Sequence, residues 1–154
     1  MIEPDDRDAI EREIAHFPAP RAAAVAALKI VQARRGWVDD EALAELAALL
    51  AMSTAELDGI ATFYSLIFRR PVGRHVILLC DSVSCWIAGC ERLQAALCER
   101  LGVAPGEISA GGRFTLLPAS CLGACDRAPV ALIDRDLHTH LDPDNIDERL
   151  RRYE

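Results

Sequence analysis

The chain has 154 residues, 51% of them hydrophobic and 27% charged, which is the balance of a globular protein with one domain or two small ones. Its net charge of −7 argues against nucleic-acid binding, which needs a basic face. No apolar run reaches the roughly 18 residues of a membrane span, and the N-terminal stretch MIEPDDRDAIEREI is acidic, unlike a signal peptide. We therefore expect a cytoplasmic protein with no nucleic-acid partner and no direct membrane insertion.

The first seventy residues have the pattern of a helical bundle. Prolines 18 and 20 and Gly36 separate apolar stretches of helical spacing. Ser53 and Glu56 form an S-x-x-E capping box, in which each side chain binds the other's free backbone amide. The expected helices cover 5–17, 21–37, 39–51 and 53–68. Proline and glycine at 71 and 73 then interrupt the pattern, so we predict a helical N-terminal domain over 1–70.

The remaining residues alternate between strand and helix patterns. Apolar runs of strand length predict strands at 74–80, 114–118, 130–133 and 137–141. A helix is expected over 86–102, and a last one from a cap at Asp142, with Pro143 at its first position, to about residue 152. This order predicts a small α/β domain over 71–154, with helices packed on a four-stranded sheet. The fold class of the whole chain is α+β.

Four of the six cysteines form two close pairs. Cys80 and Cys85 stand in CDSVSC, and Cys121 and Cys125 stand in CLGAC. Each pair comes directly after a predicted strand, where loops at one end of a sheet converge. Four thiolates from two neighbouring loops can surround one metal centre, so these cysteines are the candidate ligands.

The spacing of the pairs favours an iron–sulfur cluster over zinc. Zinc sites generally use tight C-x2-C turns, whereas the wider C-x4-C loop also occurs around [2Fe–2S] clusters. Gly123 lets backbone amides approach such a cluster without an intervening side chain. The absence of histidine from the pairs argues against a Rieske centre. A structural zinc site and thiol chemistry remain as alternatives, although the C-x-x-C motif of thiol–disulfide enzymes is missing.

Two further cysteines and two histidines have simpler interpretations. Cys90 is expected four positions into the helix over 86–102 and Cys98 further along it, where buried cysteine behaves as a small apolar side chain. Their Cα atoms would be about 12 Å apart, too far for a disulfide. His138 and His140 share one face of a strand; a solvated hairpin face is the expectation, and a two-histidine metal site the alternative.

The cysteine motifs resemble those of a known family. CDSVSCWIAG, followed by GRFTLLPASCLGACDRAPVALID, closely resembles the paired motifs of the E subunits of bacterial NADH–quinone oxidoreductase (respiratory complex I). The resemblance extends upstream through APRAAAVAALKIVQARRGWV and covers nearly the whole chain. It implies a helical N-terminal domain and a thioredoxin-like C-terminal domain that carries one [2Fe–2S] cluster. The motif cysteines of the family correspond to Cys80, Cys85, Cys121 and Cys125.

The resemblance also implies a function. A member of this family exchanges single electrons with FMN on the partner flavin subunit, which binds NADH, and it contacts the large iron–sulfur subunit. It would lie peripheral to the inner membrane, with no catalytic residue of its own. In agreement, the sequence contains no G-x-G-x-x-G dinucleotide motif after a strand. The alternatives are the equivalent subunit of a soluble NAD-dependent formate dehydrogenase or hydrogenase and, from a different class, a structural zinc-binding interaction module.

Overall fold

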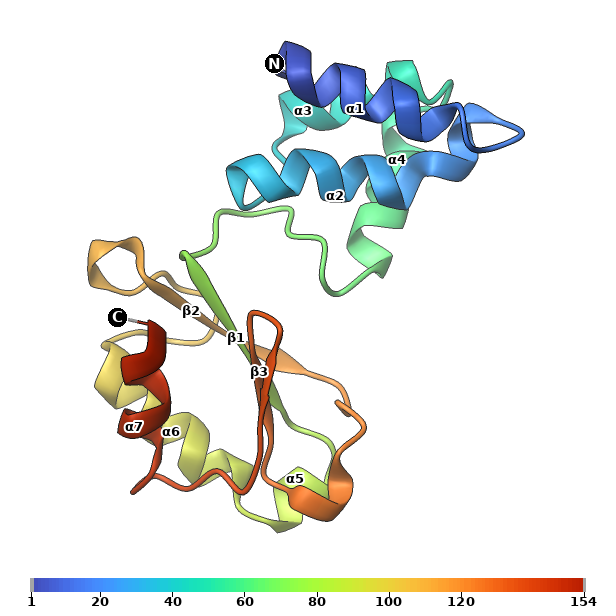
Figure 1. Ribbon diagram of the computed structural model, residues 1–154. Coiled ribbons are helices and arrows are strands. Elements are labelled where there is room, and N and C mark those ends of the chain that lie inside the picture. The colour runs from blue at the N-terminus through green and yellow to red at the C-terminus, as the bar shows by residue number, and fades with distance from the viewer. Residues whose placement is uncertain (1, 154) are drawn as a thin grey trace. The chain divides into compact units, whose positions relative to one another are not determined.

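The computed structural model describes residues 2–153 of the chain. The chain divides into two compact units, 1–71 and 72–154. The first unit is helical and the second contains the sheet, so the α+β class is confirmed (Figure 1). Whether each unit folds as an independent domain, with the boundary at residues 70 and 71, stays a prediction.

The helical unit is built from short helices around an alanine- and leucine-rich core. These helices are α1 (Pro4–Ile14), the 3₁₀ turn η1 (Pro20–Ala23), α2 (Ala24–Arg35), α3 (Asp40–Leu49) and α4 (Thr54–Phe63). The fully buried side chains include Ile10, Ala27, Leu28, Ala42, Leu46, Leu57 and Ala61. The small alanines let neighbouring helices approach closely, so a unit with few aromatic residues still forms a packed core.

The ends of these helices follow sequence signals. The Glu56 amide donates to the Ser53 hydroxyl at 3.2 Å, and the Ser53 amide donates to the Glu56 carboxylate at 2.9 Å. The predicted capping box is therefore confirmed. Helix α3 is capped in the same way by Asp39, whose carboxylate accepts the Ala42 amide at 2.7 Å. Helix α2 ends at Gly36, which has the left-handed conformation (φ 79°) that glycine adopts without strain.

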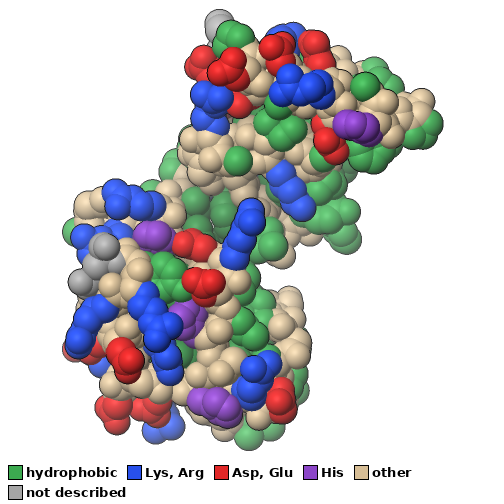
Figure 2. Space-filling model, viewed as in Figure 1, with side chains coloured by type: hydrophobic (Ala, Val, Ile, Leu, Met, Phe, Trp, Pro, Cys, Tyr) green, Lys and Arg blue, Asp and Glu red, His purple; other side chains and the backbone are tan. Residues whose placement is uncertain are grey.

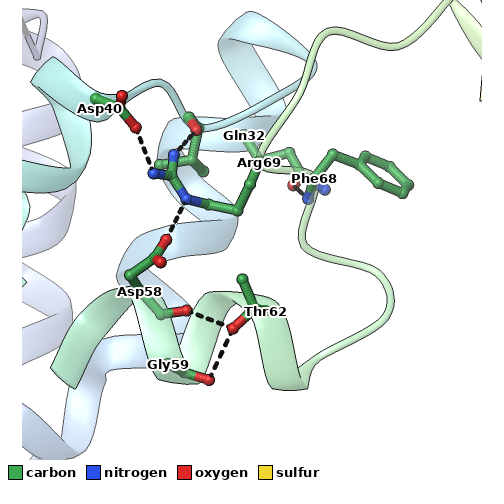
Figure 3. A network of polar contacts seen from close by, with 8 residues as sticks. Gln32, Asp40, Asp58, Gly59, Thr62, Phe68 and Arg69 are labelled. Carbon is green, nitrogen blue, oxygen red and sulfur yellow. Dashed lines mark hydrogen bonds and ion pairs between the residues drawn. The ribbon is translucent and has the colours of Figure 1, made fainter. Parts of the chain in front are cut away.

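Helix α4 ends five residues earlier than predicted, and side chains hold the segment that follows it. Gln32 of α2 donates to the Leu66 carbonyl at 2.8 Å. Its side-chain oxygen accepts the Phe68 amide at 2.6 Å (Figure 3). One amide side chain therefore satisfies both a donor and an acceptor of irregular backbone. Without Gln32, the Leu66 carbonyl and the Phe68 amide would lose these partners. These bonds explain why the segment after α4 is ordered although it is not the helix that the sequence had suggested.

Arg69 ties the same segment to two helices. Its guanidinium, which is only 16% exposed, donates to Asp58 of α4 at 2.7 Å and to Asp40 of α3 at 2.6 Å (Figure 3). It also donates to the Val38 carbonyl. The fork geometry of arginine makes three separate contacts possible from one side chain, so the segment after α4 closes the helical unit.

The second unit is a four-stranded sheet of order β2-β1-β3-β4. Its strands are β1 (His75–Cys80), β2 (Phe114–Ala119), β3 (Ala131–Ile133) and β4 (Asp136–His138). Strands β1 and β2 pair in parallel, and the other neighbours are antiparallel. Helices α6 (Cys90–Leu101) and α7 (Ile146–Leu150) pack on one core with the sheet, through Leu93, Leu97, Ile146 and Leu150.

Two helices of this unit begin elsewhere than predicted. The helix expected over 86–102 is divided into α5 (Val83–Ile87) and α6, because Gly89 takes a left-handed conformation (φ 94°) between them. The last helix begins at Ile146 and continues into the 3₁₀ turn η4 (Arg151–Tyr153). Asp142 is not its cap: the Asp142 carboxylate accepts the Asp144 amide at 2.9 Å, which folds this segment into a turn. Two further 3₁₀ turns are η2 (Ala110–Gly112) and η3 (Cys125–Arg127).

Hydropathy does not single out a membrane span. Within residues 2–153, no single helix is long and apolar enough to cross a membrane, and α3 with α4, bent by 113° at their connection, meet the length and composition test only as a pair.

Gly73 allows a close backbone contact at the start of the sheet unit. A Cβ atom at this position would lie 2.7 Å from the backbone carbonyl carbon of Phe114, and the Gly73 amide donates to the buried Thr115 hydroxyl at 2.8 Å. Because the obstacle is backbone, it cannot swing away as a side chain could. Gly59 differs, since it lies inside α4 with nothing within 4 Å of an added Cβ.

We predict opposite effects of alanine at these two glycines. Gly73→Ala should lower the free energy of unfolding by about 1–3 kcal/mol, through overpacking against β2. Gly59→Ala should raise it by about 0.5–1 kcal/mol, because alanine favours a helix interior. Urea denaturation followed by circular dichroism measures both. A neutral Gly73→Ala would show that the chain does not pass this close to β2.

The cap of α3 predicts a pH-dependent stability. The Ala42 amide, and then the Arg35 guanidinium at 2.6 Å, hold the pKa of Asp39 below its usual value. A depressed folded-state pKa stabilises the native state above the unfolded value, near 3.9, and this contribution is lost as the pH falls through the folded value. Asp39→Asn keeps a capping oxygen but lacks the charge. It should destabilise the chain at pH 7 by less than about 1 kcal/mol, and the difference should vanish towards pH 3.

The control for this measurement is Asp8→Asn, at an exposed position of α1. Denaturation curves between pH 3 and 7 should show that the difference in unfolding free energy between Asp8→Asn and the unaltered chain does not change with pH. A constant gap for Asp39→Asn over the whole pH range would contradict an ionised cap.

Candidate metal centre

The parallel pairing of β1 and β2 brings both cysteine pairs to one edge of the sheet. Cys80, the last residue of β1, lies opposite Ala119, the last residue of β2. Cys121 follows two residues later. Because parallel strands end on the same side, the loop after β1 and the loop after β2 emerge side by side. The structure therefore places the four predicted ligand positions on two adjacent loops.

The first pair is buried. Cys80 and Cys85 are each 1% exposed, and their thiols are hydrogen-bonded to each other. Burial raises the pKa of Cys85 to about 11; the backbone amide of Val130, which donates to its sulfur, opposes this shift, and the neighbouring Cys80 adds to it. A thiolate here needs a nearby positive charge, because burial otherwise favours the neutral thiol. A metal ion supplies such a charge.

The second pair is exposed. The Sγ atoms of Cys121 and Cys125 lie 3.3 Å apart, and the Gly123 amide donates to the Cys121 sulfur at 3.4 Å. Gly123 is left-handed (φ 81°), so its backbone can turn within the loop. This amide, and then the Cys125 thiol, lower the pKa of Cys121, whereas the contact with Cys121 raises the pKa of Cys125.

Side chains also connect the two loops. The Ser84 hydroxyl, next to Cys85 in α5, is hydrogen-bonded to the sulfur of Cys125, and Cys80 acts electrostatically on the same thiol. Among residues 2–153, no group of three or more His, Cys, Asp or Glu side chains lies close enough to hold one metal ion. The cysteines lie instead as two adjacent pairs of sulfur atoms.

The chemistry of this donor set fits an iron–sulfur cluster. In a [2Fe–2S] cluster each iron takes two protein ligands, and four cysteines complete the set. The two sulfur pairs, one on each loop, match that two-by-two arrangement. A structural zinc ion would need four ligands arranged tetrahedrally around one point. The assignment of the individual ligands stays a prediction.

Cys90 lies nearer to the pairs than the sequence indicated. It is 2% exposed and belongs to the same apolar cluster as Cys80 and Cys85, which also contains Ala124 and Val130. The break at Gly89 makes Cys90 the first residue of α6 rather than its fourth or fifth, and so brings it beside the first pair. The glycine in the stretch IAGC was the available signal. Cys98 is partly buried and packs on the separate core of the sheet unit.

Helix α5, which carries Cys85, also exposes three apolar side chains to solvent. Val83, Trp86 and Ile87 are 68%, 57% and 76% exposed. They flank Cys85, whose own side chain points into the apolar cluster. A short helix thus presents its thiol inward and three apolar side chains outward, on the element that carries a candidate ligand.

The expectation of a solvated histidine face is wrong for His138. This side chain is only 7% exposed, and its Nε2 atom lies 2.8 Å from the Tyr153 hydroxyl. Burial lowers the pKa of His138, and so do the nearby Arg149 and Arg152. His140 is exposed and left-handed (φ 51°), so the strand pattern behind the prediction ends at His138.

Comparison with known proteins places the chain in a family. Residues 10–154 match the model of the thioredoxin-like [2Fe–2S] ferredoxin family. The chain is 53% identical over 148 residues to the E subunit of the NADH-quinone oxidoreductase of Escherichia coli (strain K12), covering 96% of this chain and 89% of that protein. Identity to the E subunit of the Pseudomonas aeruginosa enzyme is 46% over 153 residues, covering 99% and 92%.

A solved structure of a different enzyme also resembles this chain. An NAD⁺-reducing [NiFe]-hydrogenase, in its air-oxidised state, matches with a TM-score of 0.71 and 31% identity, covering 85% of this chain but only 22% of the hydrogenase chain. The fold of this chain is therefore also found as a minor part of a larger polypeptide. Fold, cysteine loops and sequence agree: this chain belongs to the thioredoxin-like [2Fe–2S] ferredoxin family, and within it is similar to the E subunits of NADH–quinone oxidoreductases.

Proposed function

We propose that this chain is the electron-transfer E subunit of an NADH–quinone oxidoreductase. It holds one [2Fe–2S] cluster on Cys80, Cys85, Cys121 and Cys125 and exchanges single electrons with FMN on the partner flavin subunit. It also contacts the large iron–sulfur subunit and lies peripheral to the inner membrane. NADH and FMN bind only to the partner, and no residue of this chain is catalytic.

The arrangement of the two cysteine pairs carries this proposal. The pairs lie on adjacent loops at the carboxyl ends of two parallel strands, and the donor set is the one a [2Fe–2S] cluster takes. Its family is named for this cofactor. Bound there, the cluster supplies a centre that gains and loses one electron. The chain itself positions the cysteine sulfurs and stabilises their negative charge.

Backbone and hydroxyl groups have a defined role around these thiolates. The Val130 amide donates to Cys85, the Gly123 amide to Cys121, and the Ser84 hydroxyl bonds to Cys125. Hydrogen bonds to cysteine sulfur stabilise negative charge and so help to set the reduction potential. Three of the four ligands therefore have a hydrogen-bond partner that belongs to the protein scaffold.

The choice of parent complex rests on the comparisons. The E subunits of Escherichia coli and Pseudomonas aeruginosa align over about nine-tenths of their own length, so this chain corresponds to whole subunits of that kind. The NAD⁺-reducing hydrogenase supports the second candidate, an electron-transfer part of a soluble NAD-linked hydrogenase or formate dehydrogenase. We favour the respiratory complex, because the identity is higher and extends over about nine-tenths of each relative, against 22% of the hydrogenase chain.

The cofactor and its ligands can be tested together. The anaerobically purified chain should contain about two irons and two sulfides and give a paramagnetic signal only after reduction with dithionite. Serine at Cys80, Cys85, Cys121 or Cys125 should lower the iron content or alter this signal, because each replacement removes one of four thiolate ligands. Cys98→Ser is the matched control. Stoichiometric zinc without visible absorbance would exclude the cluster.

Cys90→Ser separates ligation from packing. Cys90 is buried beside the first pair, so serine there should lower the melting temperature while about two irons remain bound. Loss of iron in Cys90→Ser, with iron retained in Cys80→Ser, would mean that the ligand pair is Cys85 and Cys90.

Docking on a flavin subunit predicts a role for the exposed face of α5. Ile87, which is 76% exposed beside the cysteine loops, tolerates a polar side chain in the isolated chain. Ile87→Glu should leave the cluster signal unchanged but reduce co-purification with the flavin subunit by about tenfold, as expected when a charge is buried at an interface. Leu137→Glu, at an exposed position on β4, is the control. Equal co-purification of both variants would place the flavin subunit on another surface.

A further inference from the structure

A cavity of about 510 Å³ lies beside the edge strand β4, and none of its lining residues belongs to the cysteine loops. Its walls come from β4 and from the last helical turns, α7 and η4. Strand β4 is at the opposite edge of the sheet from β2, which leads to the second cysteine pair. The volume is within the range of small-molecule sites.

The walls of this cavity are positively charged. Arg135, Arg149 and Arg152 line it, and Asp136 is the one carboxylate among its lining residues. Within residues 2–153, none of the three guanidinium groups forms an ion pair. The Nε atom of Arg149 is also buried, with no hydrogen-bond partner in the described part of the chain. Figure 2 shows several Lys and Arg side chains over the region where α7 lies in Figure 1.

A hydrogen-bonded chain that includes the buried His138 lines the cavity. The Tyr153 hydroxyl donates to Asp136 at 2.9 Å and therefore accepts from the Nε2–H of His138 at 2.8 Å. Tyr153 also contacts the ring of His75, which is itself bonded to Asp134. Asp136 keeps its negative charge in this hydrogen bond, so the cavity lining combines three guanidinium groups with one carboxylate.

The imidazole of His138 and the phenol of Tyr153 are both neutral at pH 7, whereas the arginines of the lining are charged. Burial, and then Arg149 and Arg152, lower the pKa of His138, against the opposing effect of Asp136. Burial and the bond to Asp136 raise the pKa of Tyr153 to about 12. At neutral pH the cavity therefore combines three guanidinium charges, one carboxylate already engaged, and a neutral imidazole.

A second arginine-lined cavity offers a comparison. Arg100, Arg113 and Arg151 line it, but Arg100 is bound to Asp147 at 2.5 Å and to the Pro143 carbonyl at 2.6 Å. Part of its charge is already compensated within the chain. The cavity beside β4 also contains one carboxylate, Asp136, but among residues 2–153 none of its three arginines is ion-paired, so we take it as the stronger anion site.

We infer that the cavity beside β4 binds a phosphate-class oxyanion. A phosphate group carries about −1.5 to −2 charges at pH 7 and several acceptor oxygens, and the planar fork of arginine binds such oxygens in pairs. A carboxylate, with one charge and two oxygens, would compensate fewer of the three guanidinium groups. The group is supplied by free phosphate or by a nucleotide, and the site does not depend on the proposed electron-transfer function.

Nuclear magnetic resonance of the isotope-labelled, oxidised full chain tests this inference. Inorganic phosphate should produce saturable shifts at β4 and η4 when potassium chloride keeps the ionic strength constant. It should also raise the pKa of His138, because the anion offsets the arginine charges that lower it. His16, in the helical unit, is the internal control, and its resonances should not respond to phosphate. Shifts no larger than those with chloride would overturn the inference.

Matched variants separate the site from general charge attraction. The double variant Arg149→Gln with Arg152→Gln should bind phosphate at least about tenfold more weakly, since one charge-assisted hydrogen bond contributes roughly that factor. The double lysine variant, which keeps the charge but lacks the fork, should bind with intermediate affinity and controls for folding. Arg113→Gln, in the other cavity, should bind normally. Equal weakening by Arg113→Gln, or full binding by the double glutamine variant, would count against the site.

Adenosine diphosphate and adenosine identify the source of the phosphate. If the diphosphate binds about tenfold more tightly than inorganic phosphate, the site is for a nucleotide; equal affinity indicates free phosphate. Both outcomes support an oxyanion site. Adenosine alone should not bind, and binding of adenosine as tight as that of the diphosphate would show that the arginines are not the recognition element.

Discussion

The site depends above all on one pairing: the parallel register of β1 with β2. Parallel neighbours end on the same side of a sheet, so two loops far apart in sequence begin next to each other. Cys80 opposite Ala119 sets the spacing, and a slip by one residue would turn every side chain of the strand to the other face. The crossover through α5 and α6, needed to join parallel strands, also carries Cys85 to the same edge. The same strand pairing therefore determines both the fold of the sheet unit and the positions of the cysteines.

The two cysteine pairs differ in environment, and this difference has a physical consequence. Cys85 is buried, so its thiolate is unfavourable without a neighbouring positive charge, whereas Cys121 is exposed and stabilised by the Gly123 amide. Deprotonation of Cys85 is thus coupled to metal binding more strongly than deprotonation of Cys121. The exposed loop is open to partners and solvent, and the buried loop is anchored in an apolar cluster with Cys90 and Val130.

Local signals were sufficient for much of the fold. The Ser53 capping box and the left-handed Gly36 each act within one helical turn, so the sequence alone predicts them correctly. The failures lie where a longer-range or competing interaction decides. Gly89 fits a helical pattern in the sequence, although a left-handed residue there divides the helix. Asp142 binds a turn amide instead of a helix amide. His138 is buried by Tyr153, fifteen residues later, which no strand pattern reveals.

The order of the strands separates two chemistries within one small unit. Strand β2 leads to the exposed cysteines at one edge, and β4 lines the arginine cavity at the other. An edge strand offers unpaired backbone groups, and covering it with a charged C-terminal segment limits pairing with other chains. The arginines beside β4 can protect the edge strand without binding an anion. Protection alone, however, does not require that they line a cavity together with a buried histidine. The cavity and the buried histidine that lines it, rather than the charge alone, distinguish a binding site from a protected edge.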